Sequence, residues 1–76
     1  MIVVKDTDKL RETIIKSGFT YSDIAQETGY TRAYVSSILS GKRNPNPKIA
    51  VNICEILKIK FDDHFFIESV HKTITT

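Results

Sequence analysis

The sequence has little of what secreted, disulfide-stabilised and membrane proteins depend on. It contains one cysteine, Cys54, so no disulfide can form within the chain, which fits a reducing, intracellular setting. The N-terminal apolar run covers only Met1–Val4, and no apolar stretch is long enough for a signal peptide or a membrane span. We therefore expect a cytoplasmic protein with no membrane partner.

The material for catalysis is also scarce. A chain of 76 residues supports one domain with a small core and leaves little room for a site of many parts. Cys54, His64 and His71 do not have the spacing of metal ligands, and Cys54 lies in an apolar segment typical of a core. No nucleophile–base pair or glycine-rich phosphate loop is present. We expect no enzymatic activity, no metal and no cofactor.

Acidic residues are absent from one long stretch. No Asp or Glu occurs from Thr28 to Cys54, whereas the whole chain has nine acidic residues and a net charge of +2. The same stretch carries a local charge of +4, from Arg32, Lys42, Arg43 and Lys48. A basic region on a small domain is expected for binding a polyanion, although a solvated positive surface would give the same distribution.

Apolar periodicity and capping residues predict five helices. Thr20 and Asp23 form a variant capping box, and Asn46 precedes Pro47 in the way that a cap precedes the first helical residue. In the first helix, the spacing favours Leu10, Ile14 and Ile15 as inward-facing residues. The expected helices are Thr7–Ser17, Tyr21–Thr28, Arg32–Ser40, Pro47–Leu57 and Asp62–Phe66.

The two ends of the chain have a β-like pattern. Met1–Lys5 is rich in β-branched residues, and Ile67–Thr76 alternates with a period of two. A single strand is not stable by itself. The C-terminal segment therefore needs Ile2–Val4 of the same chain, a partner subunit, or both.

The stretch from Thr20 to Ser40 predicts two short helices joined by a tight turn at Gly29. Ala25 is small where the two helices must cross closely. In the second helix, Val35, Ile38 and Leu39 have core spacing. The opposite side carries Arg32, Ala33, Ser36 and Ser37. A pair of helices of this shape can place the second helix in the major groove of DNA.

With these features in this order, the chain resembles the Cro/C1-type, or XRE-like, helix-turn-helix family of phage and bacterial transcriptional regulators. The similarity covers about Leu10 to Phe66. The residues that carry it are Leu10, Arg11, Ser22–Ala25, Gly29–Thr31, Val35, Ser36, Ile38, Gly41–Pro45 and Phe61–Asp63. The resemblance implies an all-α, five-helix bundle of the lambda-repressor-like type, with possible short β segments at the termini. It would form one domain over 1–76, with its core at 6–66 and extensions at 1–5 and 67–76.

The resemblance also implies roles for individual residues. The positions that usually meet bases are Arg32, Ala33, Ser36 and Ser37. Those that usually meet phosphates are Tyr21, Ser22, Thr31, Lys42, Arg43 and Asn44, and Tyr34 is a further candidate for a phosphate contact. Ser37 departs from the family pattern, in which a long polar or basic side chain is frequent. Tyr34 stands at the edge of its helix. Two roles remain open for its side chain: contact with a phosphate, or partial packing against the protein.

Two hypotheses follow for the function. The first is a sequence-specific regulator of phage or mobile-element repressor type that binds a double-stranded DNA operator as a homodimer, with the terminal segments as candidates for the dimer surface. The second is a small modulator or antirepressor that acts by binding another phage or bacterial regulatory protein. The short side chains at Ala33, Ser36 and Ser37 favour the second, and the basic region favours the first.

Overall fold

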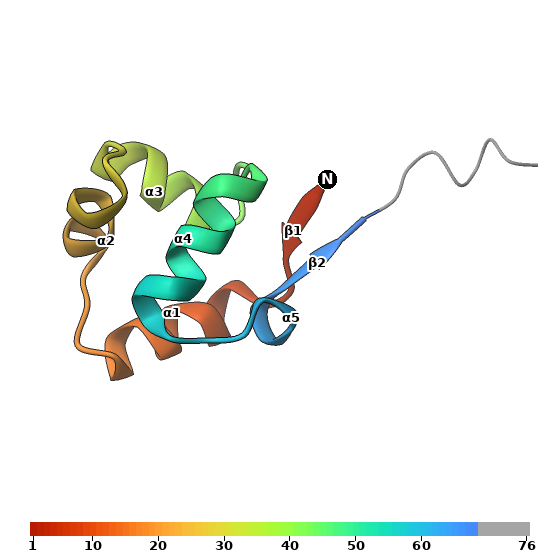
Figure 1. Cartoon of the computed structure of the whole chain (residues 1–76), viewed down its shortest axis with the longest axis horizontal. Helices are drawn as coiled ribbons and strands as arrows, with labels where there is room; N and C mark the ends of the chain where they lie inside the picture. Colours follow the sequence, from red (N-terminus) through yellow and green to blue (C-terminus); the bar gives the residue numbers. More distant parts are fainter. Residues whose placement is uncertain (69–76) are drawn as a thin grey trace, which may run out of the picture.

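Five helices lie between two short strands in the computed structural model, which describes residues 1–68 (Figure 1). The elements are β1 (Ile2–Val4), α1 (Thr7–Lys16), α2 (Tyr21–Thr28), α3 (Arg32–Leu39), α4 (Pro47–Leu57), α5 (Phe61–His64) and β2 (Phe65–Ile67). The predicted helical class, with short β segments near the termini, is confirmed. No helix in residues 1–68 combines the length and the apolarity needed to cross a membrane.

Side-chain caps fix where the helices begin. The Asp6 carboxylate accepts N–H bonds from the first turn of α1, and the Asn46 side chain does the same for α4, with Pro47 at its first position. At α2, the Asp23 N–H donates to Thr20 Oγ1 at 3.1 Å, and the Thr20 N–H donates to Asp23 Oδ2 at 2.9 Å. Each cap satisfies a backbone donor that the helix leaves unpaired. The caps expected at Thr20–Asp23 and at Asn46 are therefore confirmed.

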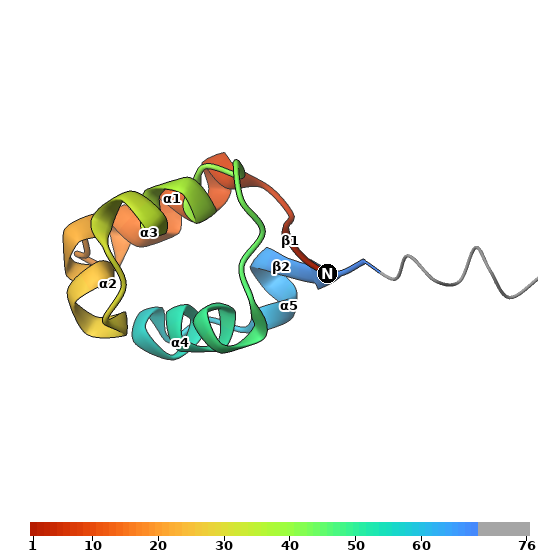
Figure 2. The same ribbon diagram turned by 90° about the horizontal axis from the view of Figure 1, so that it is seen from above.

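The helices form a ring around one apolar core. Seen from above, α1 and α3 lie on one side, α4 lies on the other, and α2 closes the end (Figure 2). The largest fully buried side chains come from all of these elements and from β2: Leu10, Ile14, Ile24, Val35, Ile38, Leu39, Ile49, Ile53 and Phe65. Burying one such side chain contributes about 1.5–3 kcal/mol, so this shared core holds α3 in position.

The prediction that Ile15 faces inward is wrong, because 66% of this residue is exposed. Leu10 and Ile14 are four residues apart and share the buried stripe of α1. Ile15 is one residue further on and is rotated by about 100° from that stripe. The boundaries of α1 and α3 were each predicted one residue too long, since Ser17 and Ser40 are C-caps.

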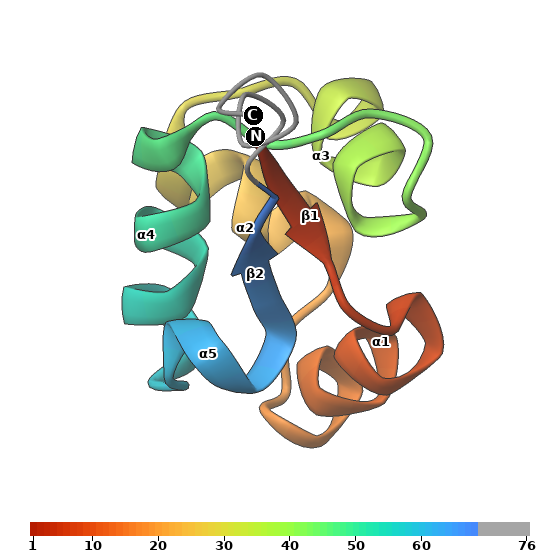
Figure 3. The ribbon, with the colours of Figure 1, turned by 90° about the vertical axis from the view of Figure 1, so that its right-hand side faces the viewer.

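The chain ends meet in a two-stranded antiparallel ribbon. The register pairs Ile2 with Ile67, Val3 with Phe66 and Val4 with Phe65. Figure 3 shows this ribbon between α4 and α1. Ile67, the first residue of the expected C-terminal segment, thus pairs within the same chain, which is one of the expected alternatives.

The last helix was predicted at Asp62–Phe66, but α5 ends at His64 and the next three residues are strand. Phe65 is completely buried, and pairing with β1 decides its conformation. Residues 69–76, which make up most of the strand expected at Ile67–Thr76, lie outside the described residues.

Candidate nucleic-acid interface

A short turn sets the angle between α2 and α3. Gly29 ends α2 with φ +82°, and its N–H donates to the Ala25 carbonyl oxygen at 2.9 Å. This left-handed conformation is inexpensive for glycine. Thr31 then begins α3, and its Oγ1 accepts the Tyr34 N–H at 3.1 Å. Ala25, which was expected where the two helices cross, is buried in the apolar core.

Helix α3 has one face that residues 1–68 leave uncovered. Val35, Ile38 and Leu39 are buried, so the side of the helix away from them faces solvent. Figure 1 shows α3 at the upper surface of the molecule. Arg32 and Ala33 are exposed at the start of this face, whereas the two serines expected beside them, Ser36 and Ser37, are half-buried.

Ser37 has a structural role that sequence reasoning missed. Its hydroxyl donates to the Tyr34 carbonyl oxygen at 2.7 Å, so its proton is already engaged within the helix. Its own carbonyl oxygen accepts the N–H groups of Lys42 at 2.9 Å and Arg43 at 3.1 Å. Ser37 therefore ties the basic loop to the end of α3, and its hydroxyl keeps only lone pairs for a ligand.

The loop after α3 carries the expected basic side chains, since Lys42, Arg43 and Asn44 are all exposed. The Arg43 guanidinium carbon lies 5.3 Å from the centroid of the Tyr34 ring. The Tyr34 ring in turn lies 5.0 Å from that of Tyr30, centroid to centroid. A cation–π contact of this kind contributes about 0.5–1 kcal/mol at an exposed site. Tyr34 is half-buried against the core, and its ring lies beside the Arg43 guanidinium.

The remaining predicted residues lie at helix starts. Tyr21 is half-buried against the core at the first position of α2, and Ser22 beside it is exposed, as is Thr31 before α3. Backbone N–H groups at a helix N-terminus favour anions, so these positions suit contacts to phosphate.

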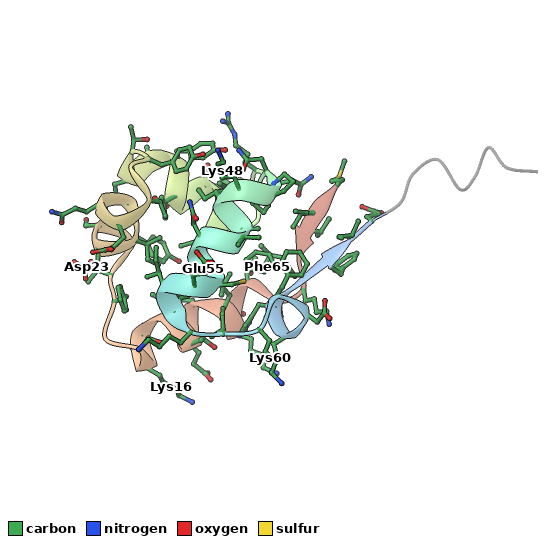
Figure 4. The ribbon with its side chains drawn as sticks, viewed as in Figure 1. Lys16, Asp23, Lys48, Glu55, Lys60 and Phe65 are labelled. Carbon is green, nitrogen blue, oxygen red and sulfur yellow. The ribbon has the colours of Figure 1, made fainter. Side chains whose placement is uncertain are left out.

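Lys48 and Ser40 belong to the same region, and the sequence did not predict a DNA contact for either of them. Lys48 is exposed in the first turn of α4 and lies at its upper end (Figure 4). Ser40 is exposed four residues after Ser36, and its hydroxyl donates to the Ser37 carbonyl oxygen at 3.3 Å. The helical period of four could have identified Ser40, and the acid-free stretch could have identified Lys48.

The two buried groups with a shifted pKa, His64 and Cys54, lie in α5 and α4 and not in the helix-turn-helix. Burial lowers the pKa of the His64 imidazole below its ordinary value of 6.5; Asp63 opposes this effect, and Lys9 and Lys5 add to it. His64 Nε2 lies 3.4 Å from Thr13 Oγ1. Cys54 is buried, as predicted, and burial raises the pKa of its thiol. In residues 1–68, no three His, Cys, Asp or Glu side chains gather in a way that could hold a metal ion.

A capped helix pair with a left-handed glycine between its members, an uncovered second helix and an adjoining basic loop defines a helix-turn-helix domain. The family model described as helix-turn-helix matches residues 9–64. The chain belongs to the Cro/C1-type (XRE-like) helix-turn-helix family of transcriptional regulators, as the pattern of its residues indicated.

Two proteins of Bacillus subtilis (strain 168) are similar to the chain. One is YgzD, named an uncharacterized HTH-type transcriptional regulator, which is 28% identical over 61 residues that cover 80% of this chain and 92% of YgzD. The other is YvzC, which has the same description and is 24% identical over 66 residues, covering 87% of this chain and 86% of YvzC. Both similarities cover 80% or more of this chain.

Proposed function

We propose that the chain is a sequence-specific, DNA-binding transcriptional regulator that inserts α3 into the major groove of an operator. The observation that carries the proposal is the uncovered face of α3 beside the acid-free basic loop. The apolar side of α3 is buried, so the residues on the opposite side of this helix are those available to a ligand. The names of YgzD and YvzC support the same function.

The base-contacting set in this proposal is Arg32, Ala33, Ser36 and Ser37. Arg32 is the one long donor among these four, and arginine paired with guanine is the commonest specific contact. Ala33 suits a thymine methyl group. Because the Ser37 proton is engaged within the helix, Ser37 acts as an acceptor, from an adenine or cytosine amino group for example.

Phosphate contacts supply orientation and much of the affinity. The proposed set combines the helix starts with the basic loop: Tyr21, Ser22, Thr31, Tyr34, Lys42, Arg43 and Asn44. The Arg43 guanidinium lies over the Tyr34 ring in the first turn of α3, so it is oriented before DNA arrives.

The test is a binding titration of the DNA upstream of the gene at several salt concentrations. Lys42→Ala and Arg43→Ala should each weaken binding to all sequences and reduce the salt slope by about one. Lys16→Ala is the matched control, because Lys16 lies at the end of α1 on the far side of the molecule from α3 (Figure 4). Absence of binding at low salt, or an equal loss for Lys16→Ala, would contradict the proposal.

Arg32→Ala tests the base-reading role separately. It should cost about 1–3 kcal/mol at the preferred site and change binding to unrelated DNA much less. Equal losses on all sequences would show that Arg32 contacts only phosphate.

The working form in this proposal is a homodimer on an inverted repeat, because one domain reads one half-site. The regulator would be of phage or mobile-element repressor type and would act in the cytoplasm. The neighbouring genes test the phage or mobile-element origin, and an operator with two-fold symmetry tests the dimer.

A second candidate function is a modulator or antirepressor that binds another regulatory protein. The short side chains of α3 and the engaged Ser37 proton favour it, since they leave Arg32 as the one long donor among the four proposed base contacts. Co-purification with a neighbouring repressor, together with no binding to upstream DNA at low salt, would select this function over the first.

A further inference from the structure

An apolar hollow of about 650 Å³ opens on the surface between the start of α4 and the terminal ribbon. Figure 3 shows α4 and β2 side by side on this face. The lining includes Pro45 and Pro47 at the start of α4, Val51 one turn further on, Phe61, and Met1 and Ile67 from the ribbon. No charged side chain lines the hollow.

The hollow contains apolar side chains that the fold leaves in contact with water. Among residues 1–68, five large apolar side chains are exposed, and three of them line it: Met1 at 60%, Val51 at 47% and Ile67 at 70% exposed. Single exposed apolar residues are ordinary, but a contiguous group around a concave surface marks an interaction site.

We propose that this hollow and its rim form the contact between two copies of the chain. The inference rests on the homodimer of the proposed function and assigns its surface. The hollow is apolar, and Met1, Val51 and Ile67 around it are exposed, so a second copy can cover them. A two-fold interface brings the same patch of both copies together, so the exposed apolar side chains of one copy meet those of the other.

The charges along α4 are arranged for the same symmetry. Lys48, Val51 and Glu55 are exposed and three to four residues apart, so they share one side of the helix. Figure 4 shows Lys48 and Glu55 along α4. If two α4 helices pack antiparallel about an axis near Val51, Lys48 lies opposite the partner's Glu55, and the reverse pair forms as well. Neither residue makes an ion pair within residues 1–68.

The position of the hollow is compatible with DNA binding. The terminal ribbon, which contributes Met1, Ile2 and Ile67 to the lining, lies across α4 from α2, so a second copy seated there leaves the exposed face of α3 free for DNA (Figure 1). Pro45 follows directly after Lys42–Asn44 in the chain, which places the interface next to the basic loop. Two joined copies would thus hold two basic loops at a fixed separation.

The test is sedimentation equilibrium of the full chain without DNA over a range of concentrations. The wild type should form dimers, and Val51→Glu and Ile67→Glu should each weaken dimerisation by about tenfold or more. Ile15→Glu is the matched control, because Ile15 is 66% exposed on α1 and does not line the hollow. Circular dichroism should show the same helical signal for all four proteins.

Charge reversal provides a second arm. Lys48→Glu and Glu55→Lys should each weaken the dimer, and the double variant should restore it, because the two pairs re-form with opposite signs. A wild type that stays monomeric, or equal dimerisation of Val51→Glu and the wild type, would overturn the proposal. So would a monomer that binds a neighbouring regulator through this hollow. A monomer that still binds DNA with a salt slope sensitive to Lys42 and Arg43 would leave the DNA-binding function intact.

Discussion

Gly41→Ala tests how closely the basic loop is held against the start of α1. Gly41 has φ +84°, and a Cβ built on it would lie 3.1 Å from Cγ2 of Thr7. Gly29 has nearly the same φ, +82°, but no atom lies within 4 Å of its added Cβ. Alanine therefore has the same backbone cost at both positions. The two substitutions differ by the contact with Thr7, which Gly41→Ala alone creates.

The magnitudes follow from this difference. A non-glycine residue in the left-handed region costs about 1–2 kcal/mol, and alanine returns about 0.4–1 kcal/mol by restricting the unfolded chain. We expect Gly29→Ala to lower the free energy of unfolding by about 1 kcal/mol. Overpacking adds about 1–3 kcal/mol. Thr7 is half-buried in the first turn of α1 and can move slightly, so we expect an overpacking cost of about 1 kcal/mol. The total loss for Gly41→Ala is then about 2 kcal/mol.

Urea denaturation of the two variants measures these losses, and each kcal/mol should lower the melting temperature by about 4–8 °C. Thr7→Ser removes the crowded methyl group. Added to Gly41→Ala it should recover the extra loss of about 1 kcal/mol, whereas added to Gly29→Ala it should recover nothing. Equal losses at the two glycines, or no coupling between Thr7 and Gly41, would refute the reasoning.

Three further predictions concern the core, a cap and pH. Ile38→Ala should lower the free energy of unfolding by about 2–5 kcal/mol in urea titrations, whereas Ile15→Ala should change it by less than about 0.5 kcal/mol. Thr31→Ala removes the cap of α3 and should cost about 1 kcal/mol, seen as a lower melting temperature. Burial lowers the pKa of His64 in the folded state below the ordinary value of 6.5, so the unfolded chain binds this proton more readily. The stabilisation from neutral His64 should be fully present above pH 6.5 and should decline as the pH falls toward the lowered pKa of the folded state. Urea titrations that show the same pH dependence for His64→Gln and the wild type would contradict this.

The sequence was sufficient where local chemistry decides the structure. The Thr20–Asp23 box, the Asn46–Pro47 start and the glycine after α2 each act within a few residues, so their pattern predicts helix ends within about one residue. The prediction failed where the local structure depends on pairing between segments that are far apart in the sequence. Phe65 is strand rather than helix because β1, at the other end of the chain, provides its partner.

The same distinction holds for the candidate site. The outward face of α3 was predictable, because the spacing of its buried residues fixes which side remains. The bonds of the Ser37 carbonyl to the loop and the Arg43–Tyr34 contact depend on how the chain turns back after α3, which no local pattern reports. Lys58 ends α4 with φ +56° in a left-handed conformation, and no glycine or asparagine signalled it.

The tyrosines described above have a spectroscopic consequence. The chain has three, Tyr21, Tyr30 and Tyr34, all within the helix-turn-helix, and it has no tryptophan. Emission excited near the tyrosine absorption maximum therefore comes from this region alone. Because Tyr34 lies against both Tyr30 and the Arg43 guanidinium, a ligand that draws Arg43 away changes the surroundings of the emitting rings. The protein thus carries an intrinsic fluorescent reporter at the candidate interface, and a DNA titration can be followed without an attached dye.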